Sequence, residues 1–303
     1  MAYKMRTKPN DYVILTELNK RMSLSEQDKQ YLYNLKKGYE GEQKLDHLLE
    51  QYHFDQNCYV LNDIHLKYKN TSFQIDTLLI FLNRILFFEV KNYEGDYFLE
   101  GDKFYLLPKQ ELTNPLNQLN RTESLLRQFI LNLGFDIKVD GILFFINPEF
   151  TLYQAPLNKP YILPTQIERY IKQLKDDSPK ISRKMKKLAD LIVTHHHETT
   201  PFSQVPPYKY EDLKKGISCG ACGNLETTIQ GRNCICSLCS YTELVSTSIL
   251  RSINEFKILF PNAPITTSAI YDFCKIISSR KRINRVLVKN FHMVGSRKIA
   301  HYE

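Results

Sequence analysis

The segment from Phe73 to Lys91 constrains the fold more than any other stretch, because two long apolar runs flank a short polar break. The runs are rich in Ile, Leu and Phe, and the break is Asn83-Arg84. Asn tolerates the positive φ that tight hairpin turns require. We therefore expect two antiparallel strands joined by a two-residue loop, with Leu82 opposite Ile85.

Three charged residues interrupt this apolar hairpin: Asp76, Glu89 and Lys91. In the expected register Asp76 lies opposite Lys91, and Leu78 lies opposite Glu89. Side chains alternate along a strand, so the three charges share one face and the two carboxylates are diagonal neighbours. Burying them is costly unless they are paired or bind a metal. The cluster is therefore either a structural ion-pair network or a functional site.

The residue types in this cluster match the needs of metal-dependent phosphodiester cleavage. Two carboxylates bind a hard cation such as Mg²⁺ or Mn²⁺, and the cation lowers the pKa of a bound water. A lysine ammonium stabilises the charge that develops on the phosphate. A Glu-x-Lys pair is also common on solvated strands. Its position directly after Phe87-Phe88 favours the catalytic interpretation.

A long helix is expected before the hairpin. Ser25 predicts its N-terminus, and the helical pattern runs to about Tyr52. Glu42 lies on the apolar stripe of this helix, which directs its carboxylate toward the core, and Gly38 and Gly41 would allow a neighbouring backbone to approach closely. The alternative is a glutamate at the helix surface.

A second helix is expected after the hairpin, with Asn114 as its cap and Pro115 at its first position, running to about Leu133. Gln118 and Arg121 lie near its N-terminus and can face the sheet or a phosphate. A solvated helix end is the alternative interpretation.

Further strands and helices complete the expected first domain. The hairpin Tyr97 to Leu107, turning at Gly101-Asp102, should extend the sheet. The apolar segment from Gly141 to Ile146 predicts a strand buried on both faces. The remaining expected elements are strands at 59–64 and 161–163 and helices at 165–175 and 181–193.

Five of the seven cysteines fall within 21 residues, which favours a metal site in a reducing compartment over a disulfide scaffold. Two CxxC pairs, Cys219/Cys222 and Cys236/Cys239, can complete a tetrahedral thiolate shell, the preference of structural Zn²⁺. Cys234 is interpreted as a small buried residue, although it could replace Cys239 as a ligand. A closed four-thiolate site serves folding and not chemistry.

Positive charge gathers at the C-terminal end of the chain. The whole chain carries a formal charge of +8, and 275–303 holds eight Lys or Arg against one acidic residue. Helices are expected at 248–259, at 266–276 and from 279, resembling a helix-turn-helix with a β-wing that bears Arg297 and Lys298. Nucleic-acid contact is the favoured interpretation, and a solvated terminal helix is the alternative.

The chain is longer than one average domain. We expect a nuclease-like domain with an N-terminal helix at 1–198, a linker at 199–216, a zinc ribbon at 217–246 and a basic helix-turn-helix-like module at 247–303. The N-terminal residues contain no apolar signal segment, and no apolar run is long enough to span a membrane. A cytoplasmic location is therefore expected.

Four ordered motifs resemble those of the nuclease-related domain (NERD) family, which is similar to the PD-(D/E)xK nucleases. They are Gly38-Tyr39-Glu40-Gly41-Glu42, Gln74-Ile75-Asp76, Glu89-Val90-Lys91-Asn92-Tyr93-Glu94-Gly95 and Asn114-Pro115-Leu116-Asn117-Gln118. The resemblance implies a restriction-endonuclease-like mixed sheet flanked by helices. It also implies Asp76 and Glu89 as metal ligands, Lys91 as the catalytic lysine, and Glu42 and Gln118 as supporting residues. Two departures are Ile75, where the superfamily has proline, and a hairpin turn without glycine.

Three functions follow as expectations. The first is a Mg²⁺- or Mn²⁺-dependent DNA nuclease in which the zinc ribbon and the basic C-terminal module grip the substrate. The second is a non-catalytic DNA-binding or scaffolding protein, in which Asp76, Glu89 and Lys91 form only an ion-pair network. The third is an RNA-processing nuclease, since no base-stacking signature separates RNA from DNA. The intact set of three charged residues favours an enzyme.

Overall fold

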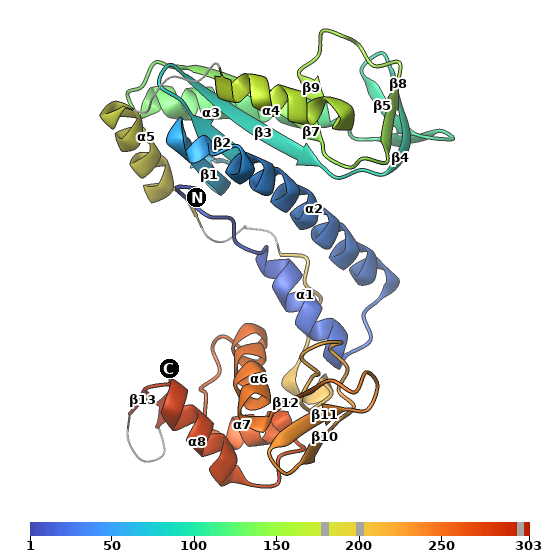
Figure 1. The fold of residues 1–303 in the computed structure, drawn as a ribbon, viewed down its shortest axis with the longest axis vertical. Helices are drawn as coiled ribbons and strands as arrows, with labels where there is room; N and C mark the ends of the chain where they lie inside the picture. The colour runs from blue at the N-terminus through green and yellow to red at the C-terminus, as the bar shows by residue number, and fades with distance from the viewer. Residues whose placement is uncertain (177–181, 198–202, 296–299) are drawn as a thin grey trace. The chain divides into compact units, whose positions relative to one another are not determined.

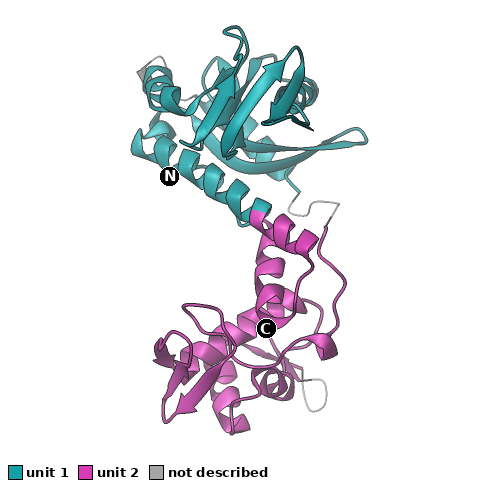
Figure 2. Cartoon of the chain, turned by 90° about the vertical axis from the view of Figure 1, so that its right-hand side faces the viewer, with its two compact units in different colours: residues 1–8, 34–202 teal, residues 9–33, 203–303 magenta. Residues whose placement is uncertain are grey.

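The computed structural model describes residues 1–176, 182–197, 203–295 and 300–303. The chain divides into two compact units, residues 1–8 with 34–202 and residues 9–33 with 203–303 (Figure 2). These units reflect packing and do not test the four domain boundaries, which stay predictions. In the part of the chain that is described, no helix has the length and apolar character needed to cross a membrane.

The first unit is built on a five-stranded mixed sheet in the order β1-β2-β3-β7-β9 (Figure 1). Its strands are β1 (Tyr59–Tyr68), β2 (Thr71–Ile80), β3 (Arg84–Lys91), β7 (Lys138–Phe145) and β9 (Tyr161–Ile162). β1 pairs antiparallel with β2, and β2 pairs antiparallel with β3. β7 runs parallel to β3, and β9 runs parallel to β7. The prediction of a mixed sheet is confirmed.

Helices cover both faces of this sheet (Figure 1). They are α2 (Glu26–Gln51), α3 (Pro115–Asn132), α4 (Ile167–Asp176) and α5 (Arg183–Thr194). On one face Leu45 of α2 packs in a cluster with Phe88 of β3 and with α4. On the other face Phe87 packs with Leu119 of α3 and with α5. Because neighbouring phenylalanines point to opposite faces, the strand needs the continuous apolar run seen in its sequence.

The two helix starts agree with the sequence. The Ser25 hydroxyl accepts a hydrogen bond from the backbone N–H of Asp28 at 3.1 Å, directly before α2. The Asn114 side chain accepts one from the backbone N–H of Leu116 at 3.0 Å, with Pro115 at the first position of α3. Both caps satisfy N–H groups that have no partner inside the helix.

The hairpin of β2 and β3 forms, but the predicted register is wrong by two residues. Ile80 pairs with Ile85, and the backbone N–H of Phe81 bonds to the carbonyl of Arg84 at 2.9 Å, so the loop is longer than the two residues expected. Phe81 is buried and Leu82 is exposed, which places the turn around Leu82. A shift of two residues leaves each side chain on its expected face.

The hairpin turning at Gly101 also forms, from β4 (Gly95–Glu100) and β5 (Lys103–Leu106). The prediction that it extends the central sheet is wrong. It belongs to a separate four-stranded sheet with β6 (Gln110–Leu112) and β8 (Phe150–Tyr153), in the order β6-β5-β4-β8. Both neighbouring positions of β3 are already occupied, by β2 on one side and by β7 along its whole length on the other.

The second unit begins with α1 (Asn10–Arg21), which packs on α6 (Val245–Leu259). The Arg21 side chain is fully buried and donates to the Glu255 carboxylate at 2.6 Å. Its guanidinium also lies 3.9 Å from the ring centroid of Phe273. A buried arginine needs such partners because unpaired burial of its charge is very costly. These contacts fix α1 within the second unit.

The rest of the second unit contains a three-stranded antiparallel sheet and three helices. The strands are β10 (Thr227–Gln230), β11 (Asn233–Cys236) and β12 (Thr242–Leu244). After α6 follow α7 (Thr267–Cys274) and α8 (Arg280–Asn290), close to the predicted positions, and then the paired strands β13 (Met293–Val294) and β14 (His301–Tyr302). Arg297 and Lys298 of the expected β-wing lie outside the described residues. A helix-turn-helix role stays a prediction.

Candidate functional site

The candidate site lies where β2 and β3 stop pairing through their backbones. Their ladder runs from Ile80–Ile85 to Thr77–Phe88. One residue further along β2, the Asp76 carboxylate accepts a hydrogen bond from the backbone N–H of Val90 at 2.8 Å. The side chain therefore takes the place of a backbone acceptor, and Asp76 is 8% exposed. This arrangement fixes one carboxylate oxygen at the end of the ladder.

Glu89, Lys91 and Gln118 form a closed set of contacts beside Asp76. The Lys91 ammonium and the Gln118 amide both donate to Oε1 of Glu89, at 2.7 Å and 2.6 Å. Lys91 also donates to the Gln118 carbonyl oxygen at 3.1 Å. Gln118 lies in the first turns of α3 and bonds to Glu89 and Lys91 of β3. It therefore faces the sheet, which is one of the two directions expected from the sequence. Arg121 is exposed.

Glu42 is brought to the same region by α2, and its partner is Arg6. Arg6 donates to Oε2 of Glu42 at 2.6 Å and to both carboxylate oxygens of Asp46 at 2.8 and 3.1 Å. It also donates to the backbone carbonyl of Asp76 at 2.7 Å, and its side chain is only 3% exposed. Arg6 thus connects the helix carboxylates to the strand that carries Asp76.

Sequence reasoning missed Arg6 and Asp46. Asp46 follows Glu42 by four residues, so helical spacing alone would have placed it on the same face of α2. Arg6 belongs to no periodic pattern. It is positioned because the preceding residues pair with β1, through an isolated bridge between Lys4 and Leu61. Only the tertiary structure shows this pairing.

One glycine permits the close approach of α2. A Cβ added to Gly41 would lie 2.7 Å from Cβ of Asn92, directly after β3, and 3.1 Å from Cγ2 of Ile146. The prediction of a close approach is confirmed for Gly41, although side-chain atoms make it and not the backbone that was expected. It is wrong for Gly38, where nothing lies within 4 Å of such an atom.

Three carboxyl groups of the site have raised pKa values, so they ionise less readily than usual. Burial and the negative charge of Asp76 raise the pKa of Glu42 to about 8, against the opposing effect of Arg6. Burial and Asp76 likewise raise the pKa of Glu89 to about 7, against the opposing effect of Lys91. Burial also raises the pKa of Asp76. When ionised, four carboxylates face two cations, Arg6 and Lys91, which leaves two negative charges uncompensated.

These residues fit a divalent cation. Carboxylate oxygens are the hard donors that Mg²⁺ and Mn²⁺ prefer. Among the described residues, Oδ1 of Asp76 and Oε2 of Glu89 accept no hydrogen bond, and are therefore available. The three carboxylates of Glu42, Asp76 and Glu89 do not bring one oxygen each within 4.8 Å of one another. A cation held by one or two carboxylates, with water and substrate oxygens, is usual for Mg²⁺.

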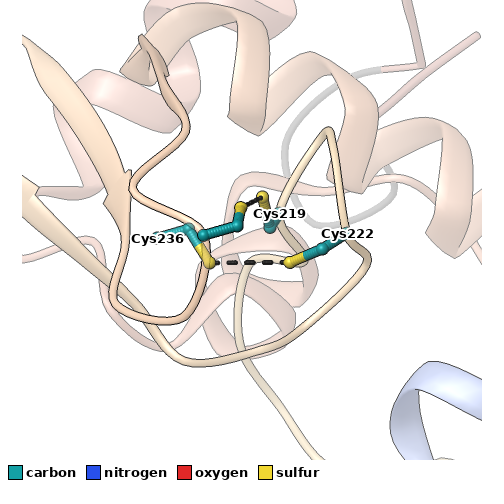
Figure 3. A group of neighbouring side chains, drawn as sticks. Cys219, Cys222 and Cys236 are labelled. Atoms are coloured by element: carbon teal, nitrogen blue, oxygen red, sulfur yellow. Dashed lines mark hydrogen bonds between the residues drawn. The ribbon is translucent and has the colours of Figure 1, made fainter.

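The second unit brings together the four predicted cysteines. The ligand atoms of Cys219, Cys222, Cys236 and Cys239 all lie within 4.8 Å of one another. Figure 3 shows the sulfurs of Cys219, Cys222 and Cys236 converging, and the Sγ atoms of Cys222 and Cys236 are 3.7 Å apart. Cys234 is buried and is not part of this cluster. The set could bind zinc.

The first unit thus has a mixed α/β fold, with a buried carboxylate–lysine cluster at the end of its central hairpin. Residues 37–146 match the family model of the nuclease-related domain. The match covers about a third of the chain and includes Glu42, Asp76, Glu89, Lys91 and Gln118, but not Arg6 or the cluster of four cysteines. Comparisons with curated proteins and with solved structures gave no match.

Proposed function

We propose that the first unit is a metal-dependent nuclease that cleaves phosphodiester bonds in DNA. The supporting observation is the shared Oε1 of Glu89, which receives both Lys91 and Gln118 beside the buried carboxylate of Asp76. This set lies inside the segment that matches the nuclease-related domain. When its four carboxyls are ionised, the cluster has two uncompensated negative charges, which favours a cation site over a self-sufficient ion-pair network.

Each residue of the cluster has a proposed role. Asp76 and Glu89 would hold Mg²⁺ or Mn²⁺. When bound, the cation supplies an activated water and stabilises negative charge on the phosphate. Lys91 donates hydrogen bonds to the developing charge of the transition state. Gln118 fixes the orientation of the Glu89 carboxylate. Glu42 holds Arg6, which in turn bonds to the backbone carbonyl of Asp76.

The cysteine cluster is proposed to hold one structural Zn²⁺. Cys219, Cys222, Cys236 and Cys239 lie within 4.8 Å of one another and would supply a tetrahedral thiolate shell with no open position. The metal would therefore stabilise the second unit and take no part in the reaction. The basic residues of α8 are proposed to contact nucleic acid, because neutralising phosphates releases counterions.

A cleavage assay tests the nuclease proposal. Labelled single-stranded, duplex and branched DNA, and RNA, are incubated with the purified chain, with and without Mg²⁺ or Mn²⁺. Asp76→Asn or Glu89→Gln should abolish metal-dependent cleavage. Lys91→Ala should lower the rate by about 10²- to 10³-fold, the usual cost of removing one transition-state donor. Lys138→Ala, an exposed lysine that pairs with Asp140, is the matched control and should leave the rate unchanged.

Three outcomes of this assay would contradict the proposal. If the chain binds DNA but cleaves none of these substrates with either cation, the cluster is a structural ion-pair network and the chain is a DNA-binding or scaffolding protein. If Lys91→Ala, Asp76→Asn and Glu89→Gln all cleave as the parent does, the activity belongs to another site or to a contaminant. Cleavage of RNA alone would assign an RNA-processing nuclease.

A further inference from the structure

A lysine-lined groove lies within the second unit, next to the first cysteine knuckle. It is a hollow of about 650 Å³ where the end of α1, the segment before the knuckle and the turn after α7 meet. Four lysines from these three parts of the chain line it: Lys20, Lys214, Lys215 and Lys275. The only acidic residue among its lining residues is Glu226. Like charges gathered in one concave surface repel one another unless an anion binds there.

The four lysines differ in the partners they already have. Lys20 is paired with Glu17 at 2.7 Å. The Lys215 ammonium donates to the carbonyls of Tyr210 and Leu213, and burial lowers its pKa. By contrast, the ammonium groups of Lys214 and Lys275 have no hydrogen-bond or ion-pair partner in the part of the chain that is described. These two charges are available to a ligand.

The backbone at both free lysines is held in place. The backbone N–H of Lys214 donates to the carbonyl of Arg21 at 2.8 Å, and the Arg21 guanidinium donates back to the Lys214 carbonyl at 3.1 Å. Lys275 ends α7 with a φ of 51°, and its N–H bonds to the Tyr271 carbonyl at 3.1 Å. A residue at positive φ without being glycine persists only where its surroundings fix it. The groove therefore presents these two lysine side chains from fixed backbone positions.

The neighbouring knuckle completes the wall of the groove. Gly223 has a φ of 75°, and the carbon atoms of the Lys20 side chain pass 3.6 Å from the position its Cβ would occupy. Asn19 and Asn224 add amide donors, and Leu225 and Leu238 add apolar surface. No aromatic ring is among the lining residues. The groove therefore offers donors for phosphate oxygens but no platform on which a base could stack.

We propose that this lysine groove binds the phosphodiester backbone of a nucleic-acid strand without reading its sequence. The inference rests on the proposed function, because the nuclease-like unit of the same chain is what selects nucleic acid among phosphate-bearing polyanions. Lys214 and Lys275 supply the free charge, and the amides of Asn19 and Asn224 supply neutral donors. The groove thus provides a phosphate contact separate from α8.

A different role for the lysines is to offset the charge of the thiolate cluster. A Zn²⁺ ion with four thiolates carries two negative charges, and Cys222 itself lines the groove. In that case the lysines would matter for metal retention and not for ligand binding. Zinc content therefore distinguishes the two roles.

The test compares two double variants of the full chain. Lys214→Gln with Lys275→Gln removes two charges from the groove, and Lys281→Gln with Lys289→Gln removes two from α8. Binding of labelled single-stranded and duplex DNA, each in two unrelated sequences, is measured by fluorescence anisotropy over a salt series without Mg²⁺ or Mn²⁺. The groove variant should bind more weakly, and the slope of log affinity against log salt should decrease by about 1 to 2, as expected for two lost phosphate contacts. Its zinc content should stay that of the parent, and both sequences should bind alike.

Several results would overturn the inference. They are an unchanged affinity and slope, a loss of zinc from the groove variant, or a defect seen only with vesicles of anionic phospholipid. These outcomes concern binding without a catalytic cation. Failure of the nuclease proposal would instead appear as absent cleavage with binding intact, so the two failures are distinguishable.

Discussion

The two units gather metal-ligating side chains in opposite ways. In the second unit the ligand atoms of four cysteines lie within 4.8 Å of one another. In the first unit the carboxylates are spread over α2, β2 and β3, and Arg6 and Lys91 already pair with part of them. If the negative charge of the thiolates is compensated mainly by a metal, that metal stabilises the fold of the second unit. The carboxylates of the first unit are instead held by Arg6 and Lys91, so they are in place before a cation binds. We therefore expect the first unit to fold without its cation and the second to need one.

Removing the metal from the second unit should give the largest effect. Chelation, or Cys219→Ser together with Cys236→Ser, should unfold this unit and leave the first unit folded. Structural Zn²⁺ contributes about 10 to 16 kcal/mol of apparent binding free energy in small zinc domains. Elemental analysis and limited proteolysis measure the change. Cys234→Ser is the control and should retain zinc. Undiminished zinc in the double variant would contradict the assignment.

The same contrast explains which parts of the two sites the sequence could predict. The cysteine ligands lie in two short knuckles, so their spacing alone identified the set that the structure brings together. The two strands of the central hairpin were also predictable from a short stretch of sequence. Their register was not predictable, because it depends on whether Phe81 or Leu82 is buried, and packing in the core determines which of the two is buried.

Long-range pairing limited the rest of the prediction. The hairpin at Gly101 was assigned to the central sheet because nothing in its sequence shows that β4 pairs with β8, more than fifty residues away. Arg6 was missed for a similar reason, since it is positioned by the bridge between Lys4 and Leu61. Local sequence patterns therefore predict strands and helix caps. They do not predict a distant residue such as Arg6 that compensates the charge of the site.

Removing Arg6 should produce the next largest effect. Arg6→Ala leaves the partly buried carboxylates of Glu42 and Asp46 without their cation, and should cost up to about 3 kcal/mol, the lower end of the range for breaking a buried ion pair. Urea unfolding of the first unit measures the loss. Arg127→Ala removes an exposed pair with Glu123 and should cost less than about 1 kcal/mol. Equal effects of the two changes would show that Arg6 carries no special charge compensation.

The stability of the cation-free first unit should depend on pH. The pKa of Glu42 is raised to about 8 and that of Glu89 to about 7, both above their ordinary value of 4.5. Between pH 4.5 and about 8 the folded chain therefore binds more protons than the unfolded chain, so the free energy of unfolding should fall as pH rises through this window. Mg²⁺ binds the ionised carboxylates and should reduce the fall. Urea titrations over this pH range, with and without Mg²⁺, measure both effects, and a stability that rises with pH in the absence of Mg²⁺ would contradict the raised pKa values.

The smallest effect is expected when two glycines of α2, Gly38 and Gly41, are each replaced by alanine. Gly38→Ala meets nothing within 4 Å and should stabilise α2 by up to about 1 kcal/mol, because alanine is the better helix former. Gly41→Ala gains the same propensity but places Cβ 2.7 Å from Cβ of Asn92, and overpacking of this kind costs about 1 to 3 kcal/mol. The two substitutions should therefore change the free energy of urea unfolding in opposite directions. Because Asn92 directly follows β3, Gly41→Ala should also displace α2 from the strand that carries Glu89 and Lys91, and lower cleavage where Gly38→Ala does not. If both variants are equally stable and equally active, the close approach at Gly41 does not position the site.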